Sequence, residues 1–114
     1  MIRKIIFHRS YFVEFYQQLS VKVQEKIEYV FYIVQYSEII PTKFFKYIEG
    51  TDGLYEIRIQ YGNNIFRIFC FFDKDKLVVL LHGIQKKSQK IPKKEIKKAE
   101  QLKKEYFIEK RKES

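Results

Sequence analysis

The sequence lacks the residues that several classes of functional site require. It contains a single cysteine, Cys70, so no disulfide can form within the chain, and nothing in the sequence clusters like a metal site. The four glycines form no phosphate-cradling loop, and there is neither a nucleophile motif nor a carboxylate pair beside a histidine. Cys70 stands among phenylalanines and is expected to be an inert core residue. We therefore expect neither a metal site nor a cofactor.

Long apolar segments are also missing. No apolar run reaches the roughly 20 residues that a transmembrane helix needs. The N-terminal MIRKIIFHRS has too short an apolar stretch for a signal peptide and no small-residue cleavage site. Hydrophobic residues make up 46% of the chain and aromatic residues 18%, which is typical of a packed domain. We expect one cytoplasmic domain over residues 1–114 that does not bind membranes, with a frayed tail at 109–114 that offers no core residue.

Positive charge is concentrated near the C-terminus. The formal net charge of the 114 residues is +9. Residues Lys86 to Ser114 hold twelve lysines and arginines and five acidic residues, a net of +7, whereas the preceding 85 residues carry only +2. A basic segment of this kind indicates a polyanionic partner such as RNA, DNA or an acidic protein. The alternative is a lysine-rich helix that its charge keeps soluble.

The N-terminal third predicts a strand followed by two helices. Residues 3–7 read as a short strand. Ser10 and Ser20 are the expected N-caps of two helices with apolar residues at helical spacing, and Pro41 is expected to end the second. The two helices should form a hairpin with one face toward the core.

The remainder predicts a strand meander and a final helix. Strands are expected at 54–61, 64–73 and 77–84, joined by short turns into an antiparallel meander. Pro92 suits the first turn of a basic C-terminal helix. The second and third of these strands are apolar on both faces, so both faces of the sheet should be covered. The predicted fold is α+β, with a helical hairpin packed on a mainly antiparallel sheet in the order β-α-α-β-β-β-α.

The turns predict how the three central strands pair. A two-residue loop at Gly62-Asn63 places Arg58 opposite Arg67. A two-residue loop at Lys74-Asp75 places Arg67 opposite His82. Four-residue loops preserve this pairing, whereas odd-length loops or bulges break it. The three side chains should then form one row on one face of the sheet.

Such a row requires a negative charge nearby. Like charges directly opposite each other, with Cβ atoms about 5 Å apart, destabilise a sheet. Glu56, diagonal to Arg67 on the same face, is one source of that charge; a bound phosphate, which suits the forks of two arginines, is the other. Lys86 joins this face if its strand continues straight. His82 is either a general acid or base or simply a hydrogen-bonded residue, and His8 is expected to be structural or exposed.

Three sequence motifs stand out: LYEIR at 54–58, FRIF at 66–69 and LHGIQKK at 81–87, the last followed by Gln-Lys and a proline. With these motifs, the stretch from Leu54 to Tyr106 resembles the second half of a HigB-type toxin in the phage-derived branch of the RelE/HigB superfamily. The preceding pair of helices resembles the family in architecture more than in amino-acid sequence. The resemblance implies a small RelE-like fold.

The same resemblance implies a function. Toxins of this superfamily belong to type II toxin–antitoxin systems and are ribosome-dependent endoribonucleases, or mRNA interferases. They enter the ribosomal A site and cut mRNA without a metal, through attack of the 2′-hydroxyl on the adjacent phosphate. A cognate antitoxin, often a helix-turn-helix HigA-like protein in this branch, holds them inactive. Two alternatives stay open: a non-catalytic RNA- or ribosome-binding module, and a degenerate toxin that acts as a protein-binding partner.

The resemblance also implies roles for individual residues. Arg67 matches the central-strand arginine that stabilises the phosphate, and Arg58 matches a basic position on the preceding strand. Lys86 or Lys87 matches the basic residue that ends the last strand. Many relatives carry a tyrosine or histidine near the C-terminus for proton transfer; this chain has lysines there, so His82 or a lysine with a depressed pKa would take that role. The lysines expected to grip ribosomal RNA are Lys90, Lys93, Lys94 and Lys97.

Overall fold

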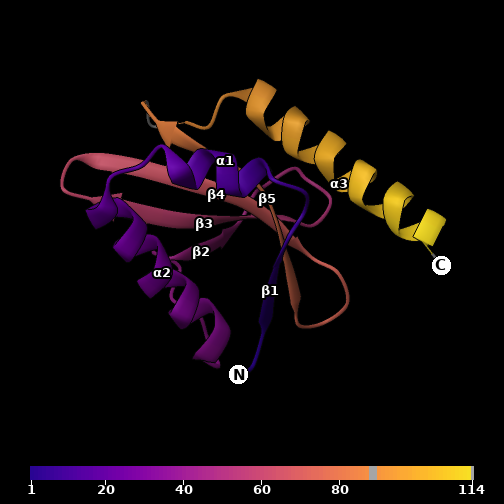
Figure 1. The fold of residues 1–114 in the computed structure, drawn as a ribbon, viewed down its shortest axis with the longest axis horizontal. Coiled ribbons are helices and arrows are strands. Elements are labelled where there is room, and N and C mark those ends of the chain that lie inside the picture. Colours follow the sequence, from indigo (N-terminus) through magenta and orange to yellow (C-terminus); the bar gives the residue numbers. More distant parts are fainter. Residues whose placement is uncertain (88–89, 114) are drawn as a thin grey trace.

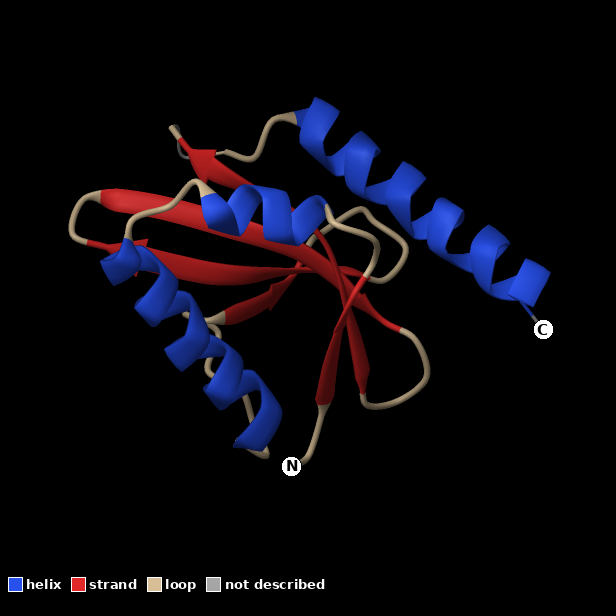
Figure 2. Cartoon of the chain, viewed as in Figure 1, coloured by secondary structure: helices blue, strands red, loops and turns tan. Residues whose placement is uncertain are grey.

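The computed structural model describes residues 1–87 and 90–113, and it shows a five-stranded sheet with helices on both faces (Figures 1 and 2). The elements in chain order are β1 (Lys4–Phe7), α1 (Tyr11–Gln17), α2 (Val21–Tyr36), β2 (Phe45–Tyr47), β3 (Leu54–Tyr61), β4 (Asn64–Phe72), β5 (Leu77–Lys86) and α3 (Lys93–Glu113). The predicted α+β fold is confirmed, with the two N-terminal helices on one side of the sheet and the basic C-terminal helix on the other.

The sheet contains one strand more than the sequence pattern predicts. The strand order is β1-β5-β4-β3-β2, with β1 parallel to β5 and the other neighbours antiparallel. The extra strand, β2, pairs with the edge of β3 and places Lys46 opposite Glu56. Its three residues are too few to show the alternation by which a strand is recognised in a sequence.

Helices α1 and α2 cover one face of the sheet. Ser20 caps α2 as predicted, because its hydroxyl oxygen accepts a hydrogen bond from the Val23 amide. Ser10 holds the N-cap position of α1 without a side-chain hydrogen bond. Helix α2 ends at Tyr36, well before Pro41, so the proline is not what terminates it. The buried stripe of α2, Val23, Ile27, Val30 and Val34, packs with Phe12 of α1 on strands β3 to β5.

Helix α3 covers the opposite face and extends through the predicted tail. Ala99 and Leu102 pack on buried residues of β3, β4 and β5. The helix continues to Glu113, so residues 109–113 of the expected tail are helical in the structure. Glu109 pairs with Arg9 and Lys110 pairs with Asp73, partners whose proximity no local pattern could reveal. Ser114 lies outside the described residues.

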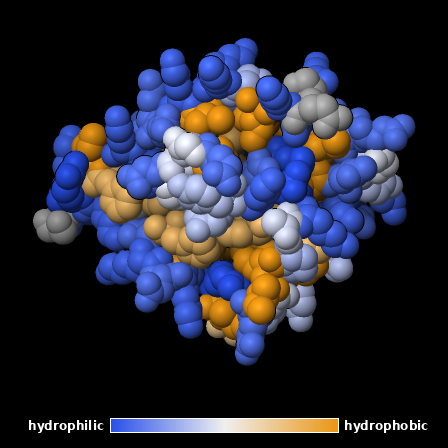
Figure 3. All heavy atoms as spheres, turned by 180° about the vertical axis from the view of Figure 1, so that it is seen from behind, coloured by the Kyte–Doolittle hydropathy of each residue, from blue (hydrophilic) through white to orange (hydrophobic). Residues whose placement is uncertain are grey.

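Apolar surface remains on the molecule in several patches. Figure 3 shows the face opposite to that of Figure 1, where hydrophilic side chains surround these patches. Exposed large apolar residues include Tyr29, Tyr32 and Tyr36 of α2. Within the described residues, no helix is both long enough and apolar enough to cross a membrane.

The pairing of β4 with β5 departs from the prediction at two places. The turn contains three residues rather than two, because the Asp73 amide donates a hydrogen bond to the Leu77 carbonyl at 2.8 Å. A β-bulge follows, where the pairing shifts between Ile68 and Cys70 and two residues of β5, Leu81 and His82, stand opposite the single residue between them. An odd-length turn and a bulge are the two irregularities that break the register expected from two-residue turns.

The longer turn and the bulge each shift the pairing of β4 with β5 by one residue, so together they shift it by two. Arg67 lies opposite Ile84, not opposite His82, so the predicted row of three side chains is wrong. Each change alone would reverse the faces of β5; together they move the pairing by two residues and keep the faces as predicted. Arg67, Ile84 and Lys86 therefore share the face that carries α3.

A glycine beside the bulge allows α1 to approach β5 closely. A Cβ atom added to Gly83 would lie 2.4 Å from Cδ2 and 2.5 Å from Cε2 of Phe15. No side chain fits at this distance, so the glycine in the LHGI sequence is explained by the ring of Phe15.

Candidate anion-binding site

Arg58 and Arg67 lie directly opposite each other on β3 and β4, as the sequence predicts. Glu56 Oε1 lies 3.3 Å from Arg58 Nε and 3.7 Å from Arg67 Nε, so one carboxylate serves both guanidinium groups. The alternative in which Glu56 neutralises the pair is therefore correct in part. A single negative charge leaves one positive charge of the pair without compensation.

Lys86 adds a third cation to this face. It stands opposite Ile65, which is two residues from Arg67 on β4 and therefore points to the same side of the sheet. Partial burial is the main cause that lowers the Lys86 pKa, and the guanidinium of Arg67 lowers it further, partly offset by Glu56. A lysine in this position gives up a proton more readily than an ordinary lysine does.

The structure distinguishes the two lysines at the end of β5. Lys87 follows the last residue of the strand and is exposed. Both lysines line a hollow with Lys94 and Glu95 at the start of α3. Only Lys86 also lines the face of the two arginines, and Arg58 and Arg67 are among its electrostatic neighbours.

Lys46 is a fourth cation, which sequence reasoning missed. Its place opposite Glu56 on β2 puts it on the same face of the sheet, and its charge contributes to the low Lys86 pKa. The only sequence signal was a lysine between two aromatic residues, in a segment that looked irregular. We call Lys46, Arg58, Arg67 and Lys86 the cationic cluster; Glu56 lies among them.

The cationic cluster opens into a groove of about 820 Å³ between the β2–β3 edge and the start of α3. Three of its four members line this groove together with Glu56, and Arg67 and Arg58 line an adjoining hollow of about 160 Å³. The other lining residues are Tyr47, Ile48, Glu49, Lys90, Ile91 and Ile96. The groove is therefore lined mainly by charged residues, together with one tyrosine and three isoleucines.

The charged groups retain unused hydrogen-bonding capacity. Arg67 Nη1 donates to the Phe66 carbonyl at 3.0 Å, and Arg58 Nη1 donates to the Thr42 carbonyl at 3.4 Å. Neither Nε atom, nor Glu56 Oε2, has a hydrogen-bond partner within the described residues, because the contacts to Oε1 are ion pairs without hydrogen-bond alignment. Burial lowers the Arg67 pKa, Glu56 raises it and Arg58 lowers it again. Buried donors left in this state favour an incoming anion.

His82 stands outside the cationic cluster. Its ring stacks on Phe69 with centroids 4.7 Å apart, and Nε2 lies 3.2 Å from Glu95 Oε1 of α3. Burial lowers the His82 pKa below its ordinary value, an effect that Glu95 only partly opposes. The neutral ring therefore joins the start of α3 to the sheet, and it does not stand across from Arg67 as the sequence suggested.

The lysines expected to hold ribosomal RNA lie around one end of the groove. Lys90 is exposed and lines the groove itself. Lys93, Lys94 and Lys97 are exposed in the first two turns of α3. Together they continue the positive charge of the cationic cluster onto the surface of the helix.

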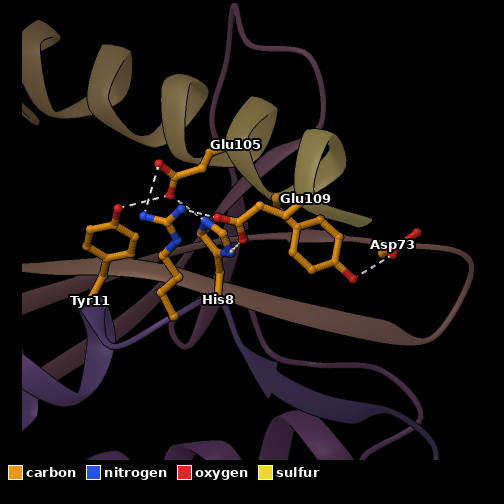
Figure 4. Close-up of polar contacts among 7 residues, drawn as sticks. His8, Tyr11, Asp73, Glu105 and Glu109 are labelled. Carbon is orange, nitrogen blue, oxygen red and sulfur yellow. Dashed lines mark hydrogen bonds and ion pairs between the residues drawn. The ribbon is translucent and has the colours of Figure 1, made fainter. Parts of the chain in front are cut away.

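A second polar network holds the C-terminal half of α3 on the sheet (Figure 4). His8 is buried, and its Nε2 lies 2.8 Å from Glu105 Oε1, which also accepts a hydrogen bond from Tyr11 at 2.9 Å. Asp73 accepts hydrogen bonds from Tyr106 at 2.7 Å and Lys110 at 2.6 Å. His8 is thus structural and buried, not exposed. Residues 1–87 and 90–113 contain no group of three or more His, Cys, Asp or Glu side chains arranged to hold a metal ion.

Comparison with known protein families identifies the family of the chain. The family described as "Phage derived protein Gp49-like (DUF891)" matches residues 14–104. The chain belongs to this Gp49-like family. The match begins in α1 and ends in α3, so it includes every residue of the cationic cluster in the Gp49-like protein.

Structural comparison places the Gp49-like protein in a known fold. The crystal structure of the archaeal RelE-RelB complex from Pyrococcus horikoshii OT3 contains a chain that matches with a TM-score of 0.53 and 22% sequence identity. The match covers 75% of the Gp49-like protein and 96% of that chain. No curated protein matches the sequence. The predicted RelE-like fold is therefore confirmed.

Proposed function

We propose that this Gp49-like protein is a HigB-type toxin of a type II toxin–antitoxin system, and that it acts in the cytoplasm as a ribosome-dependent endoribonuclease of mRNA. The observation that carries the proposal is the cationic cluster, in which two opposed arginines share one carboxylate and two lysines lie on the same face of the sheet. This arrangement suits a phosphodiester whose negative charge increases in the transition state. The RelE-like fold and the family support the same function.

The cleavage chemistry follows from the positions of the cluster residues. The guanidinium groups of Arg58 and Arg67 stabilise the phosphate while the adjacent 2′-oxygen attacks phosphorus and the bond to the 5′-oxygen breaks. The products are a 2′,3′-cyclic phosphate and a 5′-hydroxyl. Lys86 is the proposed proton donor to the leaving 5′-oxygen, because its lowered pKa makes it a better acid than an ordinary lysine. Lys87 contributes to binding.

Contacts with the ribosome are assigned to the lysines beyond the cluster. Lys90, Lys93, Lys94 and Lys97 extend the positive surface from the groove along the start of α3. Attraction of this kind depends on salt and ignores sequence. Specificity for translated messages would then come from delivery to the ribosome rather than from base contacts.

A cognate antitoxin is the proposed protein partner. The archaeal RelE chain was solved in a complex with RelB. A partner of corresponding function, of the helix-turn-helix HigA-like type, is expected for the present protein. Co-expression with the product of an adjacent reading frame tests this partner: the pair should purify together, and growth arrest should be relieved.

Primer extension on translated messages tests the activity. Expression of the wild-type chain should arrest growth and create new 5′ ends in transcripts that ribosomes are translating, and none in the same transcripts with a mutated start codon. Arg67→Ala should strongly reduce both effects, while Lys22→Ala, a charge change on the exposed part of α2, should leave them unchanged. Intact toxicity and cleavage in Arg67→Ala would remove this site assignment.

The same assay separates the proposal from its alternatives. A non-catalytic RNA- or ribosome-binding module would bind ribosomes in a salt-dependent manner and create no new 5′ ends. A degenerate toxin would bind its protein partner tightly without arresting growth. The basic groove alone supports either alternative, so new 5′ ends in translated messages are the deciding result.

A further inference from the structure

A counter-ion role explains only one of the two carboxylate oxygens of Glu56. Glu56 is only 7% exposed, yet it lines the groove that the cationic cluster forms. Its Oε1 faces Arg58 Nε at 3.3 Å and Arg67 Nε at 3.7 Å. Its Oε2 has no hydrogen-bond partner within the described residues. Leaving a buried carboxylate oxygen unpaired costs stability, so its retention at a groove points to a ligand.

The two oxygens of Glu56 divide into different environments. Oε1 is engaged by both guanidinium groups, which fixes the side chain in place. Oε2 keeps its lone pairs and can accept a hydrogen bond only, since an ionised carboxylate has no proton to donate. The missing partner is therefore a donor: a hydroxyl or an N–H group of the ligand.

The position of this acceptor fits one donor of an RNA substrate. A phosphate held by the outer nitrogens of Arg58 and Arg67 would lie next to the carboxylate that those arginines flank. In RNA, the 2′-hydroxyl is the donor adjacent to the scissile phosphate. A general base must lie within hydrogen-bond reach of the proton that it removes, and a phosphate held in this way would bring the 2′-hydroxyl toward Oε2.

We infer that Glu56 is the general base of the proposed ribonuclease, with Oε2 accepting the proton of the 2′-hydroxyl. This inference rests on the proposed function. As the proton moves to Oε2, the 2′-oxygen forms a bond to phosphorus and the bond from phosphorus to the 5′-oxygen breaks. The 5′-oxygen takes a proton from Lys86, and proton exchange between Glu56 and Lys86 through solvent restores both groups. The step needs no oxidant, reductant or further reactant.

A counter-ion role and a base role predict opposite effects of the same substitution. Glu56→Gln keeps the size of the side chain and removes its negative charge and its basicity. If Glu56 only neutralises the arginines, the variant binds RNA more tightly and cleaves at least as well as the wild type. If Glu56 is the base, RNA affinity is equal or higher while cleavage falls by roughly 100- to 10,000-fold.

The experiment measures single-turnover cleavage of a defined message on stalled ribosomes, together with binding of the purified toxin to those ribosomes. The variants are Glu56→Gln, Glu56→Asp and the control Glu14→Gln, which changes an exposed carboxylate of α1 on the other side of the sheet. We expect loss of cleavage with retained binding in Glu56→Gln, partial cleavage in Glu56→Asp and wild-type behaviour in the control. Thermal unfolding of each variant shows that it has folded.

A second substrate checks the same inference without relying on the rate alone. Replacing the 2′-hydroxyl at the cleaved nucleotide by hydrogen should weaken the binding of RNA to the wild type more than its binding to Glu56→Gln, because a carboxylate oxygen accepts a stronger hydrogen bond than an amide oxygen does. Cleavage by Glu56→Gln within about threefold of the wild type would overturn the inference and leave Glu56 as a counter-ion. Absence of cleavage by the wild type would instead overturn the proposed function, so the two failures are distinguishable.

Discussion

Arg58 and Arg67 face each other across β3 and β4, and both Nε atoms approach the same oxygen of Glu56, at 3.3 and 3.7 Å. Two like charges in this arrangement are stable only while a negative charge lies between or beside them. Residues that share one counter-ion are not independent, so the effects of changing them should not add.

Arg58→Ala and Arg67→Ala should each reduce single-turnover cleavage, and the double variant should lose less than the product of the two effects. Each single change already disrupts the shared contact with Glu56. The measurement is a double-mutant cycle on cleavage rate, with unfolding free energies recorded in parallel. Strict multiplication of the two effects would show that the arginines act separately.

The second prediction concerns Lys46, which only the structure placed in the cluster. Lys46→Gln should weaken binding to ribosomes and to single-stranded RNA while leaving the fold intact, because the side chain is exposed on a short edge strand. The slope of log affinity against log salt should shrink by about 0.7, the value for one phosphate contact on a single strand. Lys4→Gln, an exposed lysine of β1, is the matched control.

The third prediction concerns pH and Lys86. The Lys86 pKa is lowered by burial and by the positive charges of Arg67, Arg58 and Lys46, and Glu56 opposes part of this effect. A lysine that donates a proton must be protonated beforehand, so wild-type cleavage should fall as pH rises through this lowered pKa. Lys86→Arg should remove that alkaline limb and reduce the rate, since arginine keeps its proton throughout. An unchanged alkaline limb in the variant would assign the donor to another group.

The fourth prediction is one of stability. Gly83→Ala would place a methyl group 2.4 Å from the ring of Phe15, so the ring or the strand would have to move. Overpacking of this kind costs about 1–3 kcal/mol. Denaturant unfolding should show this loss, and Phe15→Leu should recover part of it in the double variant. The methyl group of Gly50→Ala would meet no neighbouring atom, so this variant measures the cost of a positive φ without overpacking.

The fifth prediction concerns the anchor of α3. Burial raises the Asp73 pKa, but hydrogen bonds from Lys110 and Tyr106 outweigh it and hold the pKa below its ordinary value of 3.8. A carboxyl with a depressed pKa stabilises the fold above the unfolded-state value, and this contribution disappears as pH falls through the folded-state value. Asp73→Asn should therefore cost about 1–3 kcal/mol at pH 7. The difference from the wild type should shrink below pH 3.8. A difference that stays constant with pH would exclude the charge as its cause.

The sequence predicted the arginine pair because a short, glycine-containing turn joins the two strands. Gly62 takes a positive φ of 59°, which a two-residue hairpin turn favours, and the register of Arg58 and Arg67 follows from it. The pairing of Arg67 was not predictable in the same way. The turn after Asp73 has no glycine, and the bulge lies where Leu81 packs with residues of α3 and His82 contacts Glu95, contacts that local sequence does not encode.

The remaining differences arise from contacts distant in the chain. Lys46 joins the cluster only because β2 pairs with the edge of β3, and the three residues of that strand carry no recognisable period. The end of α3 is ordered by Arg9 and Asp73, which lie far from it in sequence. Such pairings become visible only after the sheet is assembled, whereas α2, with a cap and a buried stripe, could be predicted from its own residues.

The turn after β4 and the bulge in β5 also constrain how this segment can vary in length. Each adds one extra residue to the pairing, and the face on which Lys86 lies depends on whether the number of extra residues is even or odd. A deletion at either place alone would turn Lys86 toward α1 and away from the arginines, whereas one deletion at each place would restore it. Natural and engineered variants that keep the groove should therefore gain or lose residues between Asp73 and Lys86 only in pairs.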